Sequence, residues 1–244
     1  MYLIFSSADV AAYFQSRSPQ LNIEMIYIPT LEITANDSEL TKLAKTINDY
    51  DYAIITSAYA IKLADGTIKN ATNSVFITSG QETATKLTDL AINSTVLFPL
   101  QNSGSQAIIA EILPDLDLAN KKILIVRGEL ANTDINNYLS GIEGVICDEI
   151  IVYHQKLLSL DTAYLKKLLE DPKLQGIIIT SSQLVNHLFH EAKKNDYLSL
   201  LQQQKFITLH PNIRDVLVQN NVTHVYLTKQ ASLVAIVDKI KGLI

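Results

Sequence analysis

The feature that most constrains the fold of this sequence is a strand-turn-helix pattern that occurs twice. The tetrapeptide Ile-Ile-Thr-Ser stands at residues 54–57 and again at 178–181, each time between an apolar run and a segment of helical period. Ordered self-similarity along a chain indicates internal duplication, so we expect two similar lobes. The supporting matches, in chain order, are residues 2–6 with 123–128, Phe-Ile-Thr at 76–78 with 206–208, and the helical segment 107–112 with 235–240.

Short runs rich in Ile, Val and Phe alternate with helical segments, a pattern typical of parallel sheets covered by helices. We therefore predict an α/β fold of two similar lobes, each a parallel sheet flanked by helices. The expected strands are 2–5, 52–56, 75–78, 96–98, 123–127, 177–180, 206–209 and 224–227. The clearest expected helices, with apolar residues at three- and four-residue spacing, are 37–47, 81–90, 106–113, 161–170, 183–194 and 233–241.

Composition narrows the class of protein. The chain has 244 residues, of which 48% are hydrophobic, enough for two ordinary domains with real cores. It carries 20 basic and 25 acidic residues, a net charge of -5, with no basic cluster that would follow a phosphate backbone. No apolar stretch approaches the roughly 20 residues that span a bilayer, and the N-terminal sequence lacks the pattern of a signal peptide. We expect a cytoplasmic protein without nucleic-acid or membrane partners.

Familiar catalytic and metal-binding motifs are missing. The sequence has no G-x-G-x-x-G after a strand, no P-loop, no G-x-S-x-G and no H-E-x-x-H. His187 and His190 could share a metal, but Glu191 is the one obvious third ligand, so we interpret them as a solvated helix face. The single Cys147 lies in a strand-like run and is interpreted as a buried thiol.

The repeated Thr-Ser turns lie where ligands bind in open parallel sheets, at the carboxyl ends of the strands. A Ser or Thr at that position caps the following helix, and the first-turn N–H groups there bind anions. Capping alone implies no ligand, but five such turns are expected to face one cleft between the lobes. They are Ser6-Ser7, Thr56-Ser57, Thr78-Ser79-Gly80, Ser103-Gly104-Ser105 and Thr180-Ser181-Ser182.

The order of these motifs resembles the uroporphyrinogen-III synthase family. The pieces that carry the resemblance are Thr56-Ser57, the Gly-x-x-Thr-Ala of Gly80, Thr83 and Ala84, the strand end Arg127-Gly128, Val152-Tyr153, and Thr180-Ser181. The likeness covers nearly the whole chain. It departs from the family at Ala58-Tyr59-Ala60, where an Asn is frequent, and at Leu209-His210-Pro211-Asn212, which stands in place of a second Gly-x-x-Thr turn.

The resemblance implies an architecture in which two lobes exchange their first strands through two extended linkers. The linkers would be the long extended segments Asn22–Thr34 and Val145–Gln155, which could otherwise be long edge strands. One discontinuous domain is then expected at residues 1–32 plus 155–244. The inserted domain is expected at 33–154.

The implied reaction cyclises the linear tetrapyrrole hydroxymethylbilane to uroporphyrinogen III, with inversion of the last pyrrole ring, loss of water and no cofactor or metal. The implied partners are this substrate and, transiently, the preceding enzyme of the pathway. By resemblance Tyr153 is the catalytic candidate, as a proton donor. The expected substrate-binding residues are Thr56, Ser57, Gly80, Thr83, Ser103, Gly104, Ser105, Arg127, Gly128, Ser181, Ser182, His210 and Asn212.

The sequence also permits other interpretations of Tyr153, of Arg127 and of the chain as a whole. Tyr153 could simply pack at the second extended segment. Arg127 could pair with Asp148 or Glu149 instead of a substrate carboxylate. The whole chain could be a non-catalytic two-lobed module that binds small anions.

Overall fold

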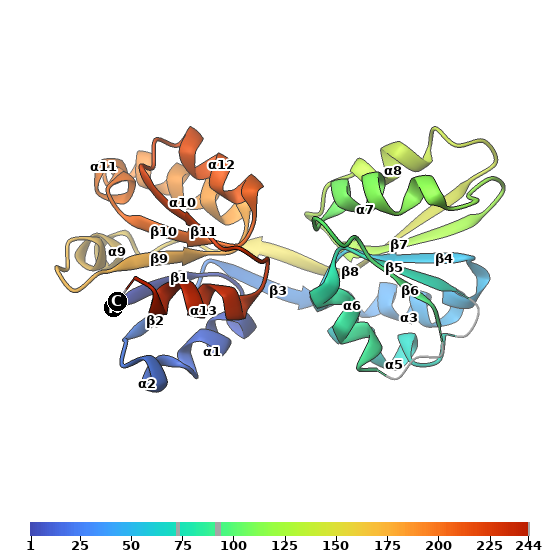
Figure 1. Cartoon of the computed structure of the whole chain (residues 1–244), viewed down its shortest axis with the longest axis horizontal. Helices are drawn as coiled ribbons and strands as arrows, with labels where there is room; N and C mark the ends of the chain where they lie inside the picture. The colour runs from blue at the N-terminus through green and yellow to red at the C-terminus, as the bar shows by residue number, and fades with distance from the viewer. Residues whose placement is uncertain (72–73, 91–93, 244) are drawn as a thin grey trace. The chain divides into compact units, whose positions relative to one another are not determined.

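The computed structural model describes residues 1–71, 74–90 and 94–243 of the chain (Figure 1). They form two compact units, which we call the terminal unit, Met1–Glu32 with Lys156–Ile244, and the central unit, Ile33–Gln155. Each is built around parallel β-strands, with helices on both faces of the sheet, which confirms the predicted fold class. In the described ranges, every helix falls short of the length and apolar character that crossing a membrane requires.

The terminal unit contains a five-stranded sheet in which all described neighbours are parallel. Its strand order is β11 (His224–Leu227), β10 (Lys205–Thr208), β9 (Gly176–Ile179), β1 (Tyr2–Phe5) and β2 (Met25–Tyr27). One face is covered by α9 (Thr162–Leu169), α10 (Ser182–Lys194), α11 (Leu198–Gln202) and α12 (Pro211–Gln219). The other is covered by α1 (Ala8–Gln15), α2 (Ser18–Leu21) and α13 (Leu233–Lys241).

The central unit contains a six-stranded sheet. Its order is β3 (Leu31–Ala35), β8 (Ile146–Leu157), β7 (Lys122–Gly128), β4 (Tyr52–Ile55), β5 (Val75–Thr78) and β6 (Val96–Leu97). Helices α3 (Asp37–Thr46), α4 (Ala58–Leu63), α5 (Asp65–Ile68) and α6 (Gln81–Thr88) lie on one face, with α7 (Ser105–Glu111) and α8 (Asp134–Leu139) on the other (Figure 1). Two short 3₁₀ turns, Ile47–Asp49 and Leu113–Asp115, complete the unit.

The two sheets are copies of one pattern. The order β2-β1-β9-β10-β11 in the terminal unit corresponds to β8-β7-β4-β5-β6 in the central unit. The register also agrees, because Phe5 lies opposite Ile179 as Val126 lies opposite Ile55. In this pairing β1 joins a strand of the second repeat and β7 joins a strand of the first, so each repeat gives its first strand to the other sheet.

The central strands explain why the sequence folds this way. Ile54 and Ile55 on β4, and Ile178 and Ile179 on β9, are fully buried, because helices cover both faces of a parallel sheet. Alternate residues of each strand therefore enter different cores, as Ile54 does on one side of β4 and Ile55 on the other. The apolar runs that predicted these strands are the direct result of that double coverage.

The two long extended segments differ in the structure. The segment predicted at Val145–Gln155 is the single 12-residue strand β8. The segment predicted at Asn22–Thr34 is divided into β2 and β3, with Ile28, Pro29 and Thr30 between them. Pro29 has no backbone N–H and cannot take part in a continuous ladder, which accounts for the break at this place.

Candidate functional site

The repeated Thr-Ser turns have the same backbone geometry in both units. Ser57 begins α4 with φ -144° and ψ 132°, and Ser181 begins α10 with φ -147° and ψ 144°. The Ser57 Oγ accepts a 3.1 Å hydrogen bond from the Tyr59 N–H, and the Ser181 Oγ accepts one of 3.1 Å from the Leu184 N–H. Both serines are therefore N-caps at the carboxyl end of a buried strand.

Tyr153 lies beside the first of these turns. Its hydroxyl donates a 3.1 Å hydrogen bond to the Ser57 Oγ, and its ring meets the Tyr59 ring edge-on at a centroid distance of 5.2 Å. The side chain is 7% exposed. Burial raises the pKa of the Tyr153 phenol, and the hydrogen bond to Ser57 opposes that rise. The phenol thus keeps its proton throughout the neutral range.

The Tyr153 ring packs directly against Gly128. A Cβ atom placed on Gly128 would lie 2.3 Å from both Cε2 and Cζ of Tyr153, much closer than van der Waals contact permits. The approach results from a bulge, since Arg127 pairs with Ile151 while Gly128 pairs with Tyr153. The Glu129 N–H donates to the Tyr153 carbonyl oxygen at 3.1 Å and fixes the backbone there.

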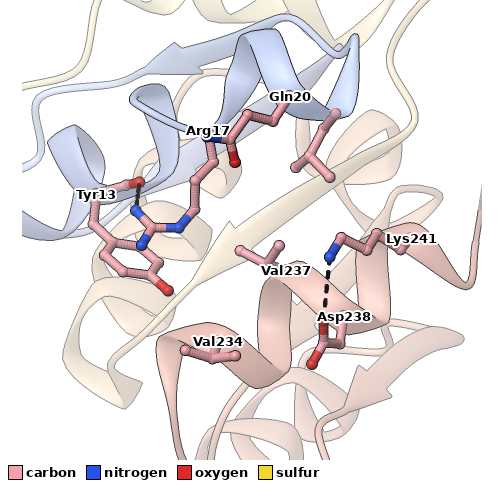
Figure 2. Close-up of a pocket in the computed structure, with 8 residues that line it drawn as sticks. Tyr13, Arg17, Gln20, Val234, Val237, Asp238 and Lys241 are labelled. Carbon is pink, nitrogen blue, oxygen red and sulfur yellow. Dashed lines mark hydrogen bonds and ion pairs between the residues drawn. The ribbon is translucent and has the colours of Figure 1, made fainter.

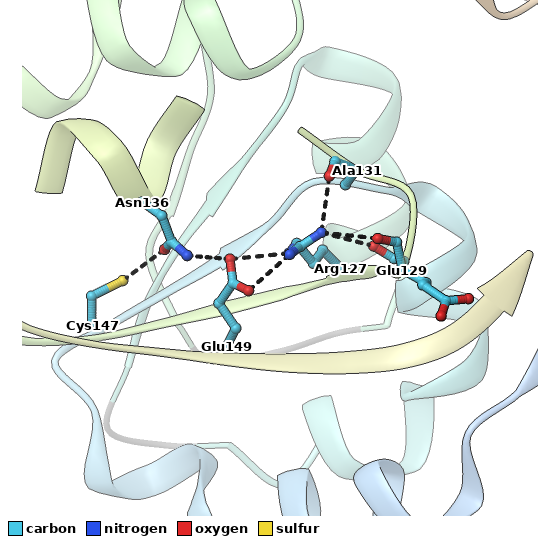
Figure 3. A network of polar contacts seen from close by, with 7 residues as sticks. Arg127, Glu129, Ala131, Asn136, Cys147 and Glu149 are labelled. Carbon is cyan, nitrogen blue, oxygen red and sulfur yellow. Dashed lines mark hydrogen bonds and ion pairs between the residues drawn. The ribbon is translucent and has the colours of Figure 1, made fainter. Parts of the chain in front are cut away.

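Arg127 points into the central unit and is used to hold this turn (Figure 3). Its Nε and Nη2 donate to the Glu149 carboxylate at 3.1 and 2.8 Å, and its Nη1 donates to the carbonyl oxygens of Gly128, Glu129 and Ala131. Glu149 also accepts from the Asn136 side-chain amide. Of the two interpretations made from the sequence, the internal pair with Glu149 is the one that forms, and we do not assign Arg127 to substrate.

Asp148, the other partner considered for Arg127, accepts a hydrogen bond from the Tyr50 hydroxyl at 2.9 Å. Burial and this bond raise the pKa of Tyr50 to about 12. Cys147 donates to the Asn136 Oδ1 at 3.2 Å, and burial raises the pKa of its thiol to about 11. Such a thiol is protonated at neutral pH and is a poor nucleophile.

Two further turns of the central unit lie against each other. The Gly104 N–H donates to the Ser79 carbonyl oxygen at 2.7 Å, and a Cβ on Gly80 would meet the Ser103 Cβ at 3.0 Å. Gly80 begins α6 and Gly104, with φ +97°, begins α7, so neither helix has a side-chain cap. The structure thereby brings together Gly80, Ser103, Gly104 and Ser105. Thr83 is buried nearby, 3.3 Å from the Ser79 Oγ.

The terminal unit places its predicted residues along the carboxyl edge of its own sheet. Ser6 and Thr180 are joined by a 2.6 Å hydrogen bond between their hydroxyls. The Ser182 Oγ is buried without a hydrogen-bond partner in the described part of the chain. His210 begins α12 without a side-chain cap bond to that helix, and the exposed Asn212 accepts from the Ile213 N–H at 3.0 Å.

His187 departs from the solvated helix face predicted for it. Its Nε2 lies 2.8 Å from the Leu158 carbonyl oxygen, so it bridges α10 to the segment before α9. Its neighbour His190 is exposed as expected. Among residues 1–71, 74–90 and 94–243, no group of three or more His, Cys, Asp or Glu side chains converges as metal ligands do.

The terminal unit also contains a hollow of about 320 Å³ (Figure 2). It is lined on one side by α1 and α2 and on the other by α13. Its cationic side chains already have partners, since Arg17 lies 3.5 Å from the centroid of the Tyr13 ring and Lys241 lies 3.6 Å from Asp238. The hollow contains none of the residues that the sequence singled out.

Sequence reasoning missed two side chains that shape the candidate site. Tyr59 packs against Tyr153, and Glu111 binds the loop before α7. An aromatic residue two positions after a repeated cap could have drawn attention to Tyr59. Nothing in the local sequence indicates the contact of Glu111.

Comparison with known families gives a match over most of the chain. The sequence profile described as "Uroporphyrinogen-III synthase HemD" matches residues 14–238. No curated protein matches the sequence.

Solved structures share the fold. A mutant uroporphyrinogen III synthase from the extremely thermophilic bacterium Thermus thermophilus aligns with a TM-score of 0.64 at 13% identity, covering 100% of this chain and 98% of that one. Uroporphyrinogen-III synthetase from Helicobacter pylori 26695 aligns with a TM-score of 0.59 at 18% identity, covering 100% and 99%. At these identities the likeness concerns the fold.

Proposed function

Because the chain belongs to the uroporphyrinogen-III synthase family, we propose that its strand-end turns bind the substrate carboxylates and that Tyr153 supplies the proton for dehydration. The enzyme cyclises hydroxymethylbilane to uroporphyrinogen III, with inversion of the last pyrrole ring and loss of water, a reaction of heme biosynthesis. The anion-binding module without catalysis is not favoured, since the family match spans residues 14–238.

The observation that carries the proposal is the setting of Tyr153. The leaving hydroxyl needs a proton to depart as water, and a buried phenol with a raised pKa holds one at neutral pH. Gly128 beneath the ring and Ser57 at the hydroxyl hold the phenol in one orientation. Arg127 and Glu149 fix the turn that carries Gly128.

The substrate bears acetate and propionate groups on every pyrrole ring, yet the chain has a net charge of -5. Backbone amides resolve this conflict, because a hydrogen bond to a charged group contributes about 1.5 to 3 kcal/mol without any basic side chain. Helices α6 and α7 start at glycines without side-chain caps, so no side chain of the cap residue competes for their first N–H groups. The residues we propose for binding are Thr56, Ser57, Gly80, Thr83, Ser103, Gly104, Ser105, Gly128, Ser181, Ser182, His210 and Asn212.

Much of the rate acceleration is expected from holding a flexible linear tetrapyrrole with its two ends together. Well-oriented intramolecular reactions gain up to about 7 to 11 kcal/mol in this way. The turns would supply that orientation, and Tyr153 would act at the one step that needs a proton. No cofactor has a part in this proposal.

The test is an isomer assay with purified protein and hydroxymethylbilane, without added cofactor. The enzyme is expected to give the type III isomer, whereas the spontaneous reaction gives type I. Formation of type I alone would refute the proposed function. Within this assay, Tyr153→Phe is expected to lower the rate of type III formation about 100-fold, the usual size of a general-acid contribution, with little change in product binding. An unchanged rate would return Tyr153 to a packing role.

We also propose that the enzyme acts in the cytoplasm and contacts the preceding pathway enzyme transiently. The substrate closes spontaneously to the wrong isomer, so a short transfer distance would favour the right one. In a coupled assay with that enzyme, the share of type I isomer should stay low as the volume is increased at constant amounts of protein. A share that rises as free diffusion predicts would oppose the contact.

A further inference from the structure

The hydrogen bonds at Ser57 assign a direction to its hydroxyl proton. The Ser57 Oγ accepts from the Tyr59 N–H and from the Tyr153 O–H, both at 3.1 Å. A serine hydroxyl has two acceptor lone pairs and one donor hydrogen. Both acceptor positions are thus occupied within the central unit. The Ser57 hydrogen must therefore be donated to some third group.

The proton of Tyr153 is not directed at a ligand in this arrangement. Its O–H points to Ser57, and its ring is fixed between Gly128 and Tyr59, with only 7% of the residue exposed. To give a proton directly to a substrate, the phenol would have to give up its bond to Ser57. Ser57 itself is partly exposed at the end of β4, on the turn proposed to bind substrate.

We propose that Ser57 is the residue that hands the proton to the leaving hydroxyl, as the outer member of a two-hydroxyl relay. The Ser57 proton moves to the substrate hydroxyl oxygen as the carbon–oxygen bond breaks and water departs. The Tyr153 proton moves to the Ser57 Oγ in the same step, which leaves a phenolate and a cationic substrate. The proton that the pyrrole carbon releases on ring closure restores the pair. This inference rests on the proposed role of Tyr153.

The experiment measures the single-turnover rate of type III formation in five variants. Ser57→Ala is expected to lose about 100-fold, as a missing general acid does. Ser57→Thr, which keeps a hydroxyl, should recover most of that loss. Tyr153→Phe is measured alone and combined with Ser57→Ala. The double variant Ser57→Ala/Tyr153→Phe should be no slower than the slower of these two single variants, because both residues serve one proton transfer. Ser232→Ala is the matched control, since Ser232 caps α13 through the Ala235 N–H at 3.2 Å and has no part in the site.

The outcomes separate the relay from the function on which it rests. If Tyr153→Phe slows the reaction and Ser57→Ala does not, the relay is wrong while the role of Tyr153 stands. If the two losses multiply in the double variant, the residues act independently and the relay is also wrong. If Ser232→Ala slows the reaction as much as Ser57→Ala, the loss comes from removing a helix N-cap, and the relay is wrong. If Tyr153→Phe has no effect, the proposed proton donor itself fails.

Discussion

The turn after β4 and the turn after β9 are alike in sequence and in backbone conformation, but different side chains contact them. Ser57 and Ser181 have closely similar dihedral angles and each caps the next helix. Ser57 also receives a tyrosine hydroxyl, from Tyr153 on β8. The Ser181 Oγ accepts from the Leu184 N–H. Duplication thus produced two capped turns, and we infer that the turn at Ser57 acquired a role in catalysis.

The neighbouring strand end shows the same divergence. Counting from the equivalent pairs Phe5 with Ile179 and Val126 with Ile55, Ser6 corresponds to Arg127 and Ser7 to Gly128. The terminal unit has two small hydroxyl residues there. The central unit has a buried ion pair and a glycine that admits an aromatic ring. The difference indicates that Arg127 and Gly128 serve the placement of Tyr153.

The largest expected effect is a difference in stability between substitutions at the equivalent positions Arg127 and Ser6. Arg127→Ala would remove the cationic partner of Glu149 and one donor to each of three carbonyl oxygens, and breaking a largely buried ion pair costs about 3 to 5 kcal/mol. Ser6→Ala removes one hydrogen bond to Thr180, worth about 1 kcal/mol. Urea unfolding followed by circular dichroism measures both. Equal losses would show that the ion pair stabilises the central unit no more than one neutral hydrogen bond does.

The second comparison concerns the reaction rate, which substitutions at Gly128 and at Ser7 should affect differently. A methyl group on Gly128 forces the Tyr153 ring to move, and a displacement of about 1 Å can slow catalysis about 100-fold. Ser7→Ala should leave the rate unchanged, because the Ser7 side chain makes no cap bond and belongs to no proposed contact. Single-turnover rates of type III formation decide between these outcomes. A Gly128→Ala enzyme with full activity would mean that the close approach has no catalytic value.

Much of this architecture was predictable because it is local. The apolar runs of β1 and β5 predicted the strand limits that the structure shows, since strands buried on both faces carry little else. The helix 233–241 was likewise predicted at its observed limits from its period. The capped turns at Ser57 and Ser181 were visible for the same reason, because a cap needs only its own helix.

The site was less predictable because its contacts are long-range. Tyr153 and Ser57 are 96 positions apart, and the bulge at Arg127 and Gly128 decides which residue of β8 comes next to the turn. A shift of one residue sends a strand side chain to the opposite face. Resemblance to a family pointed to Tyr153, whereas local pattern could not. The burial of Arg127 against Glu149 was one of two interpretations that the sequence left open.

Thr78 and Thr208 offer a smaller test of the same comparison. They occupy equivalent ends of β5 and β10, and both are fully buried. The Thr78 Oγ1 donates to the Gly80 carbonyl oxygen at 3.3 Å, whereas the Thr208 Oγ1 has no partner in the described ranges. Thr78→Val should therefore lose about 1 kcal/mol of stability, and Thr208→Val should be neutral or stabilising. Denaturant midpoints at equal slope give both values, and matching losses would reveal a hidden partner at Thr208.

The smallest effect concerns the loops before α7 and α13. The Glu111 carboxylate accepts from the N–H groups of Leu100, Gln101 and Asn102 at 2.9 to 3.2 Å, whereas the equivalent residue on α13 is Lys239. These bonds, that from Gln101 above all, hold the pKa of Glu111 below its ordinary 4.5. The stabilisation is thus present above pH 4.5 and is lost as the pH falls through the lowered pKa.

Glu111→Gln should therefore speed amide hydrogen exchange in residues 100–102 at neutral pH, and the difference from the unaltered protein should shrink below pH 4.5. Lys239→Gln is the matched control and should change nothing in the loop before α13, because an ammonium accepts no hydrogen bond. Exchange measured by mass spectrometry across this range tests the claim. If the difference persists unchanged at the lowest pH, the carboxylate charge does not hold the loop, and the two loops would differ only in sequence.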